Sequence, residues 1–391
     1  MIPIAKPFMD GKEAEAAAAA ISSGWVAGGP KVLEFESEFA AYVGSKYAVA
    51  VSNCTTALHL ALIAVGVGGG DVVITVSHSF IATASSVRHA GAEPVFIDID
   101  PGTYNMTAEA LQACLENECA KKGGEFFHKK GRVAAVLLVH QMGMPCDMSA
   151  ILRVTEKYRI PVVEDAACAI GSRISLDNGA SWDMIGKPHG DIACFSFHPR
   201  KVITTGEGGM ITTGDAERDR RMRLLRQHGM SVSDLARHGS KKVVFEEYLE
   251  TGYNYRMTDI QAAIGIEQLR KMPRIIRRRR EIGALYSELL GKISWLGTEK
   301  EPAGRETNWQ SYPVRVLKGA PATRDKIMQI LLDRGVSTRR GIMNAHEEIP
   351  YRDGTVLVNS EEAKNSVILL PIFHELTDKD LMSVADILKG M

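Results

Sequence analysis

Lys201 lies between a short apolar run and a glycine-rich turn, whereas lysines usually occupy solvated helical faces. The surrounding segment, FSFHPRKVITTGEGGMITT, covers residues 195–213, and its first residues are typical of the end of a buried strand. Glycines allow a backbone to approach a ligand closely. In such a place the pKa of a lysine can fall below its usual value of about 10.4, which frees the amine to form a Schiff base. The segment alone equally permits a surface lysine in a loop.

A carboxylate, Asp165, ends another apolar run in the segment IPVVEDAACAIGS, and small residues follow it. A carboxylate at the end of a buried strand must be paired or lie at a ligand. Pyridoxal phosphate requires such a carboxylate, because a protonated ring nitrogen lets the ring accept electrons. Capping of the following helix explains the same residue equally well.

Two further segments could hold this cofactor. In AVAVSNCTTALHLAL a strand ends at Ser52 and a helix begins near Thr55 and Thr56, so free amides and hydroxyls could bind a phosphate there. In TVSHSFIATASS, Phe80 follows a strand and could stack on a planar ring. Simple N-capping and a core phenylalanine are the alternatives. Together, the lysine, the carboxylate, the phosphate site and the aromatic ring are what pyridoxal phosphate requires.

All four candidates follow predicted strands. Seven runs rich in Val, Ile and Phe are predicted as strands, at residues 47–52, 71–76, 93–99, 133–140, 160–165, 191–197 and 209–213. Helical patterns separate many of them, which favours an α/β fold whose mixed, mostly parallel seven-stranded sheet is flanked by helices. The last two strands are joined too closely for a helical crossover and should be antiparallel. Ligands bind at the carboxyl ends of such strands.

The pattern changes after residue 254. A helix is predicted over 257–272, with Thr258 as its N-cap, and it should continue past Pro273 to residue 291. Its basic run, residues 277–280, favours a solvated helix face over an anionic partner. Alternating strands and helices beyond about residue 300 predict a smaller α+β domain. We therefore expect a large cofactor-binding domain over 1–260, with the N-terminal segment, and a linking helix with a small domain over 261–391.

The composition excludes several classes of protein. The 391 residues include 47 basic and 47 acidic side chains, so nothing electrostatic favours nucleic acid or a membrane surface as a partner. Six dispersed cysteines show no zinc-binding spacing, which predicts reduced thiols and no metal. No apolar run is typical of a signal peptide or a membrane span. A cytoplasmic protein is the expectation.

The chain resembles the DegT/DnrJ/EryC1/StrS family of fold-type-I, pyridoxal-phosphate-dependent nucleotide-sugar aminotransferases. The resemblance covers nearly the whole chain. It rests on SGWVAGGPKVLEFESEFAAYVGSKYAVAVSN, FIATASSVRHAGAEPVFIDIDPGTYNM, HQMGMPCDM, VVEDAACAIGS, the Lys201 segment and GYNYRMTDIQAAIGIEQL. The Lys201 segment is highly specific to the family.

The resemblance implies a role for each candidate. Lys201 would carry the internal aldimine and move a proton between the cofactor carbon and the substrate carbon, while Asp165 would pair with the pyridine nitrogen. Phe80 would stack on the ring. The implied phosphate ligands are Thr55, Thr56 and Ser196, together with Asn254 from the second subunit of a homodimer with shared active sites.

The resemblance is less specific at the substrate. It places Trp25 and Gly28, in a Gly-Gly-Pro turn, near the nucleotide-linked sugar, and it aligns His346 loosely with a histidine near the substrate in many members. Two positions depart from the family. Cys54 stands where a glycine usually precedes the phosphate-binding threonine, and Cys168 stands where a glutamine or histidine usually contacts the phenolic oxygen of the cofactor. A thiol hydrogen-bonds only weakly.

The implied reaction moves an amino group from an amino acid, with L-glutamate expected as the donor, to a keto sugar linked to a nucleoside diphosphate. Pyridoxamine phosphate would be the intermediate cofactor form. A sugar dehydratase on the same scaffold is the alternative, but the family's dehydratases carry a histidine in place of the lysine, so Lys201 argues against it. A non-enzymatic regulator that binds the cofactor is a further alternative, although no DNA-reading module is evident.

Overall fold

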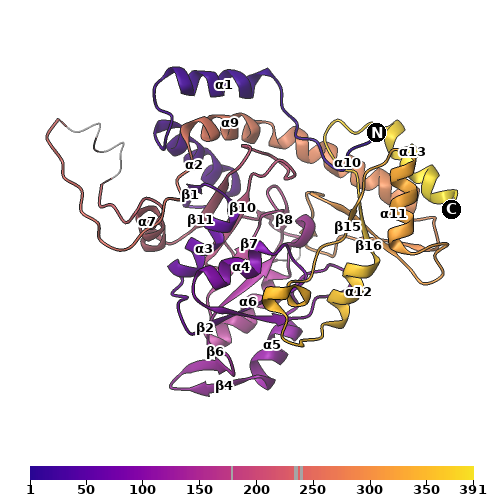
Figure 1. Cartoon of the computed structure of the whole chain (residues 1–391), viewed down its shortest axis with the longest axis horizontal. Helices are drawn as coiled ribbons and strands as arrows, with labels where there is room; N and C mark the ends of the chain where they lie inside the picture. The colour runs from indigo at the N-terminus through magenta and orange to yellow at the C-terminus, as the bar shows by residue number, and fades with distance from the viewer. Residues whose placement is uncertain (178, 233–236, 238–240) are drawn as a thin grey trace.

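The centre of the protein is a mixed sheet in which seven strands follow one another in the order β1–β11–β10–β7–β6–β2–β3 (Figure 1). The computed structural model describes residues 1–391 except 178, 233–236 and 238–240. The strands are β1 (Tyr47–Val51), β2 (Asp71–Val76), β3 (Glu93–Ile97), β6 (Gly131–Val139), β7 (Val162–Asp165), β10 (Ile192–Ser196) and β11 (Gly209–Thr213). All seven predicted strands are therefore confirmed.

The directions of the strands also follow the prediction. Strands β3, β2, β6, β7 and β10 pair in parallel, whereas β11 is antiparallel to both β10 and β1. Helices lie in the connections from β2 to β3, from β3 to β6 and from β6 to β7, and the short connection between β10 and β11 allows only a reversal. The α/β fold with a mixed, mostly parallel sheet is thus confirmed.

Helices cover both faces of the sheet. Successive side chains of a strand point to opposite faces, and the buried residues accordingly form two clusters. One cluster joins alternate residues of the strands to α3 (Cys54–Ala64). The other joins the remaining strand residues to α2 (Pro30–Val43), α5 (Ala108–Asn117) and α6 (Met148–Tyr158). The helix α4 (Ala82–His89) packs beside β2 and β3, and α7 (Ala216–Leu225) beside β1 and α3.

The helix predicted across Pro273 is two helices, α9 (Asp259–Arg270) and α10 (Met272–Leu290). Proline lacks an N–H and clashes with the carbonyl four residues before it, so it is tolerated only in a first helical turn. Pro273 lies there, at the start of α10. Thr258 caps α9 as predicted, and its side chain accepts a hydrogen bond from the backbone N–H of Gln261. In Figure 1, α9 lies against α1 (Gly11–Ser22) at the top of the molecule.

The last third of the chain builds a second, four-stranded antiparallel sheet in the order β12–β14–β16–β15. Its strands are β12 (Leu296–Thr298), β14 (Tyr312–Val316), β15 (Arg339–Arg340) and β16 (Val367–Leu370), and its helices are α11 (Arg324–Asp333), α12 (Val358–Ser366) and α13 (Asp378–Lys389). The first residues of the chain join this part: Ile2 bridges Val336, and the backbone N–H of Ile372 bonds to the carbonyl of Ile4. Both termini lie beside α13 (Figure 1). The domain boundary at residue 260 stays a prediction.

The basic run of α10 is only in part the solvated face that the sequence predicted, since Arg277 is exposed and the next three arginines have partners within the protein. Arg279 is 3% exposed and donates to the carbonyl oxygen of Trp309 at 2.8 Å. Arg278 pairs with Asp378 at 2.8 Å, and Arg280 pairs with a carboxylate of β13 (Arg305–Glu306) at 2.8 Å. These arginines therefore join α10 to segments that follow it in the chain. A run of like charges does not show which partners the fold will bring to it.

Two small β elements were not predicted. The hairpin of β4 (Cys119–Lys122) and β5 (Glu125–His128) extends the main sheet beside β6. The stretch 174–190 contains residues of β8 (Arg173–Ile174) and β9 (Asp183–Met184), which form a sheet with β13. Residue 178 of that stretch lies outside the described residues.

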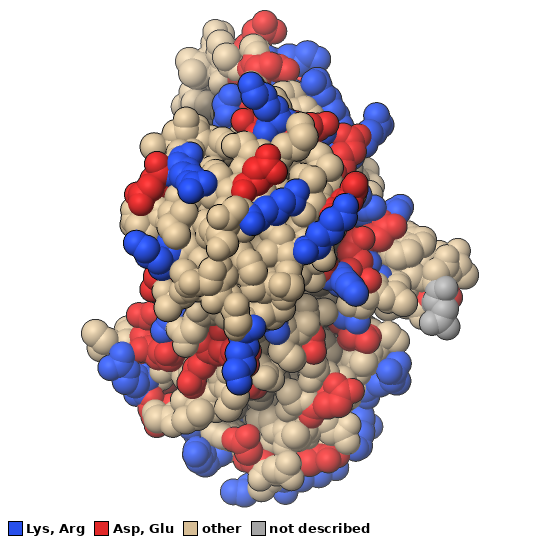
Figure 2. Space-filling model, turned by 90° about the vertical axis from the view of Figure 1, so that its right-hand side faces the viewer, with Lys and Arg blue, Asp and Glu red and all other residues tan. Residues whose placement is uncertain are grey.

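The surface carries both signs of charge. On the face shown in Figure 2, Lys and Arg side chains are interspersed with Asp and Glu, as a formal net charge of zero suggests. Within the described part of the chain, no helix combines the length and the apolar character needed to cross a membrane.

Candidate active site

The candidate site lies where β7 and β10 end, because the two parallel strands bring their carboxyl ends together. Asp165 is the last residue of β7 and pairs in register with Cys194 of β10. β10 ends at Ser196, and Lys201 follows in the turn that leads to β11. The side chain of Lys201 reaches back across the site, and its Nζ donates a hydrogen bond to Cys168 Sγ at 3.0 Å.

The pKa of Lys201 does not fall as the sequence led us to expect. Burial lowers the pKa of this amine, but the adjacent Cys168, with further contributions from Cys54 and Asp165, raises it above its ordinary value. The prediction of a lowered pKa is therefore wrong for this structure. The sequence could not supply the reason, since the three groups come from segments far from Lys201 in the chain.

Asp165 is a buried carboxylate, only 4% exposed. Its Oδ2 accepts a hydrogen bond from Thr83 Oγ1 at 2.8 Å, and its Oδ1 accepts one from the backbone N–H of Ala167 at 3.2 Å. Burial raises the pKa of Asp165, and these two hydrogen bonds oppose that rise. No cationic side chain among the described residues forms an ion pair with it. A buried carboxylate without a cation suits a protonated ring nitrogen.

A buried histidine–glutamate pair lies next to Asp165, on the other face of β7. His140 Nε2 lies 3.0 Å from Glu164 Oε2, and both side chains are fully buried. The other oxygen of Glu164 accepts backbone hydrogen bonds from His189 and Gly190, and the backbone N–H of His140 bonds to the carbonyl of Asp165. This pair joins the ends of β6 and β7 to the loop before β10. Our sequence analysis missed it, although a glutamate inside the apolar run IPVVED was a signal.

The phosphate site predicted at the start of α3 is present as a helix N-terminus, but its cap is Asn53. The Asn53 side chain accepts from the Thr56 N–H at 3.0 Å, and Thr56 Oγ1 donates to the Asn53 carbonyl at 2.8 Å. The Thr56 hydroxyl is thus occupied in the cap. The Thr55 hydroxyl, in contrast, has no hydrogen-bond partner among the described residues, and it is half-buried.

Ser196 is brought to the same helix start. It pairs with Gly209 across β10 and β11. A Cβ atom on Gly209 would lie 2.6 Å from the carbonyl carbon of Asn53 and 2.9 Å from the amide nitrogen of Cys54. Only a glycine permits this close approach. The glycine turn after Lys201 therefore packs directly against the predicted phosphate site.

The site is rich in thiols. Cys54 and Cys194 are buried, and all six cysteines are free, as predicted. Burial, and next the charge of Asp165, raises the pKa of Cys54 well above its ordinary value, so this thiol stays neutral. Cys168 is half-buried and faces Lys201. The structure thus brings Cys168 into the predicted site, at a position that borders the lysine.

Phe80 is not a core residue, because 63% of it is exposed. It occupies the turn between β2 and α4, and its carbonyl accepts from the backbone N–H of Thr83 at 3.1 Å. The hydroxyl of the same Thr83 reaches Asp165. Phe80 and the hydrogen-bond donor to the buried carboxylate therefore lie only three residues apart. The exposed ring of Phe80 is available for stacking.

The segments predicted to bind the substrate and to meet a second subunit lie at the start of α9. Gly28 belongs to the loop between α1 and α2, and a Cβ on it would lie 3.5 Å from the carbonyl oxygen of Met257. Trp25 is half-buried in the same loop, and its ring packs over Gly29. Asn254 is exposed. The carbonyl of the next residue, Tyr255, accepts a hydrogen bond from the Ser52 N–H at the end of β1.

His346 does not lie at an open surface. It is 3% exposed, its Nδ1 lies 2.5 Å from Ser77 Oγ, and its Nε2 lies 3.3 Å from Glu361 Oε1. These bonds join the turn η2 (Ala345–Glu347) to the end of β2. Both ring nitrogens are thus used inside the protein, and a contact with substrate stays a prediction.

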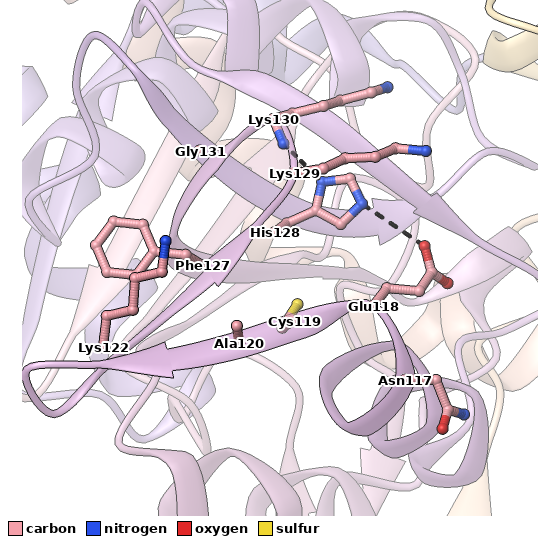
Figure 3. Close-up of a pocket in the computed structure, with 10 residues that line it drawn as sticks. All are labelled: Asn117, Glu118, Cys119, Ala120, Lys122, Phe127, His128, Lys129, Lys130 and Gly131. Atoms are coloured by element: carbon pink, nitrogen blue, oxygen red, sulfur yellow. Dashed lines mark hydrogen bonds and ion pairs between the residues drawn. The ribbon is translucent and has the colours of Figure 1, made fainter.

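A hollow elsewhere in the molecule contains none of the predicted site residues. It has a volume of about 620 Å³ and is formed by the β4–β5 hairpin and the end of α5 (Figure 3). Gly131, which lines it, begins β6, whereas the end of β6 lies beside Asp165. The hollow and the candidate site therefore lie at opposite ends of β6. Nowhere in the described part of the chain do three or more His, Cys, Asp or Glu side chains form a possible metal site.

Comparisons with known proteins agree with the geometry. A sequence model described as the DegT/DnrJ/EryC1/StrS aminotransferase family matches residues 7–389. The chain is 38% identical over 353 residues to GDP-perosamine synthase of Caulobacter vibrioides, with 90% of this chain and 86% of that protein covered. It is 36% identical to the spore coat polysaccharide biosynthesis protein SpsC of Bacillus subtilis, with 100% and 97% covered.

Solved structures show the same fold. The aminotransferase TlmJ of Streptoalloteichus hindustanus has a TM-score of 0.86 at 32% identity and covers 100% of this chain and 98% of its own. A sugar aminotransferase of Streptococcus pneumoniae, solved in a PMP form and a PLP form, is 25% identical, with TM-scores of 0.88 and 0.86 and the same coverage. DesI, solved in the presence of its TDP-sugar product, has a TM-score of 0.83 at 30% identity and covers 98% and 91%.

Proposed function

The chain belongs to the DegT/DnrJ/EryC1/StrS aminotransferase family, and on that premise we propose that it moves an amino group from L-glutamate to the keto group of a sugar carried on a nucleoside diphosphate. One observation carries the proposal. Lys201 and the buried carboxylate of Asp165 follow the ends of adjacent strands, and that carboxylate has no ion-pair partner among the described residues. This is the arrangement that an amine, an aldehyde cofactor and a protonated ring nitrogen require.

Pyridoxal phosphate is the cofactor of this family, and when bound it supplies an electron sink for bonds at the amino-bearing carbon. The residues present fit it. Asp165 would hold the ring nitrogen, and the exposed ring of Phe80 would cover one face of the cofactor ring. Thr55, Ser196 and the free amides at the start of α3 would hold the phosphate.

Lys201 is the proposed catalytic residue. Its Nζ would bind the aldehyde carbon of the cofactor and then carry a proton between that carbon and the substrate. The amine must be neutral to bind, although the site raises its pKa. Within the described residues, Cys168 Sγ is the only acceptor of a side-chain hydrogen bond from Lys201, so Cys168 is the group that most directly favours the protonated amine.

The relatives suggest the class of acceptor. One relative is named for GDP-perosamine and another for spore coat polysaccharide, and DesI was solved with a TDP-sugar product. We therefore propose a nucleotide-linked keto sugar as the acceptor and a surface polysaccharide as the end use. Trp25, Gly28 and His346 remain proposed substrate contacts.

We propose a homodimer with shared active sites as the working form. Asn254 is exposed, and its side chain has no hydrogen-bond partner among the described residues. Four large apolar side chains close before it are 62–84% exposed, namely Val243, Phe245, Tyr248 and Leu249. Apolar groups gathered in this way mark contact surfaces. An Asn254→Ala subunit paired with a Lys201→Ala subunit should restore one working site, because the site with the intact Lys201 then receives the intact Asn254 of its partner, whereas unshared sites predict no restoration.

The proposed reaction is tested by incubating the enzyme, loaded with pyridoxal phosphate, with L-glutamate alone. We expect one equivalent of 2-oxoglutarate per site and conversion of the bound cofactor to pyridoxamine phosphate, as a two-step transfer requires. A panel of keto sugars on GDP, UDP and dTDP then identifies the acceptor. Failure of every common amino donor to convert the cofactor would contradict the proposal and favour a dehydratase.

A further inference from the structure

Two hydroxyl groups form a chain that ends on Asp165. Thr83 Oγ1 donates to Asp165 Oδ2 at 2.8 Å, and Ser79 Oγ lies 2.8 Å from Thr83 Oγ1. All three side chains are buried, with exposed fractions of 4% for Ser79, 2% for Thr83 and 4% for Asp165. Both hydroxyls lie in the segment TVSHSFIATASS, where the sequence analysis singled out only Phe80 and gave Ser79 and Thr83 no role.

The direction of the chain follows from proton counting. A threonine hydroxyl has one hydrogen, and an ionised carboxylate can only accept. Since the Thr83 hydrogen points to Asp165, the hydrogen between the two hydroxyls must come from Ser79. Both bonds are therefore polarised toward the carboxylate, and hydrogen bonds in series strengthen one another at low local dielectric.

The turn that holds the chain also favours a negative charge on Asp165. Thr83 lies in the first turn of α4, where the helix dipole is positive. The burial of Asp165 raises its pKa, and the hydrogen bond from Thr83 is the largest influence that opposes the rise. Lys201 and His140 act in the same direction as Thr83, whereas the thiols of Cys54 and Cys194 are the other titratable groups near this carboxylate.

We propose that Ser79 and Thr83 are positioning residues that keep the carboxylate of Asp165 ionised and oriented to pair with the ring nitrogen of the cofactor. The expected effect on cofactor binding rests on the proposed function, but the effect on the pKa of Asp165 can be measured in the protein without cofactor. Thr83 also bonds through its backbone to the carbonyl of Phe80. The same turn thus sets the carboxylate at the ring edge and the aromatic ring at its face.

The test removes the hydroxyl without changing the shape of the side chain. In Thr83→Val we expect the pKa of Asp165 to rise by about one to two units, since the variant loses a hydrogen bond to the charged form of the carboxylate. Thr83→Ser should restore the wild-type value, and Ser79→Ala should give a smaller rise. Infrared difference spectra of the carboxylic acid band, assigned with Asp165→Asn, measure this pKa without any cofactor chemistry.

Ser86→Ala is the matched control, because Ser86 is a buried hydroxyl of the same helix that bonds to the Thr83 carbonyl at 2.8 Å. The affinity for pyridoxal phosphate, measured by fluorescence titration, should fall about tenfold in Thr83→Val and stay unchanged in Ser86→Ala. An unchanged pKa of Asp165 in Thr83→Val, or an equal rise in Ser86→Ala, would overturn the role proposed for Ser79 and Thr83. A wild-type protein that converts no amino donor would overturn the proposed function instead, while the infrared measurement still tests the role of Ser79 and Thr83.

Discussion

Lys201 Nζ lies 3.0 Å from Cys168 Sγ, so the amine proposed for catalysis contacts a thiol where the family usually has an amide or an imidazole. The contact has an electrostatic effect, because Cys168 is the main group that raises the pKa of Lys201 against the opposing effect of burial. A thiol is also a weak hydrogen-bond acceptor. The contact with Cys168 therefore favours the protonated form of Lys201.

Replacing Cys168 by alanine should lower the pKa of Lys201. The thiol raises this pKa and burial lowers it, so removing the thiol leaves burial less opposed. Capture of pyridoxal phosphate needs the neutral amine, and its rate should therefore reach its plateau at a lower pH in Cys168→Ala. Stopped-flow absorbance across a pH series measures the shift. Cys146→Ala serves as the control, since that buried thiol bonds to the carbonyl of Val139. Equal pH profiles for Cys168→Ala and wild type would contradict the argument.

Replacing Lys201 by arginine should abolish turnover while leaving the fold intact. Arginine keeps the positive charge beside Cys168 and Asp165 but stays protonated, so it cannot bind an aldehyde carbon. We expect amino transfer to fall by a factor of at least about 10³ and the absorbance of covalently held cofactor to disappear. Phosphate binding should persist, because Thr55 and Ser196 are untouched. Retained turnover with glutamate would sink the proposed role of the lysine.

The strand pattern was readable from the sequence because the seven strands lie in runs rich in apolar residues that lack strict alternation, as expected for strands buried on both faces. The same pattern placed Asp165 and Lys201 at the carboxyl ends of strands. What could not be read was the environment of each group. The pairing of Lys201 with Cys168, and of Asp165 with Thr83, joins residues 33 and 82 positions apart. Periodicity carries no information about such pairs.

The helix around Pro273 and the basic run that follows are two more places where the local sequence pattern was not enough to predict the structure. The apolar pattern is continuous across the proline, so only the missing N–H marks the break. Arg279 looked solvated because arginines usually are. It is buried because the carbonyls of Trp309 and Gln310 meet it from another segment. Local patterns predict the elements well, and they fail where a distant segment supplies the partner.

Gly209→Ala should disrupt the proposed phosphate site. The new Cβ would lie 2.6 Å from the carbonyl carbon of Asn53, and both contacting groups are backbone, so β11 or the start of α3 must move. We expect the affinity for pyridoxal phosphate and for free phosphate to fall together, with a lower thermal midpoint. Gly214→Ala is the matched control, because nothing lies within 4 Å of the Cβ that it would add. If Gly209→Ala bound phosphate like the control, the packing argument would be wrong.

Glu164 should make stability depend on acid pH. Burial alone would raise the pKa of this carboxyl, but His140 and the backbone N–H groups of His189 and Gly190 bind its ionised form, and its pKa is lowered. A lowered pKa in the folded state means that the stabilisation is complete above the unfolded value of about 4.3 and is lost as pH falls through the folded value.

Glu164→Ala leaves buried His140 and two backbone N–H groups without their acceptor, and each unsatisfied buried group typically costs about 1–3 kcal/mol, so the free energy of unfolding at pH 7 should fall by several kcal/mol. The deficit relative to wild type should shrink as the pH falls below about 4, because the wild type then loses the same interaction. Urea unfolding at pH 7 and near pH 3.5 measures both values. Glu38→Ala, at a more exposed pair with Arg270, should change stability by less than about 1 kcal/mol. A deficit in Glu164→Ala that stayed constant with pH would show that the side chain stabilises the fold through packing alone and would contradict the electrostatic role of Glu164.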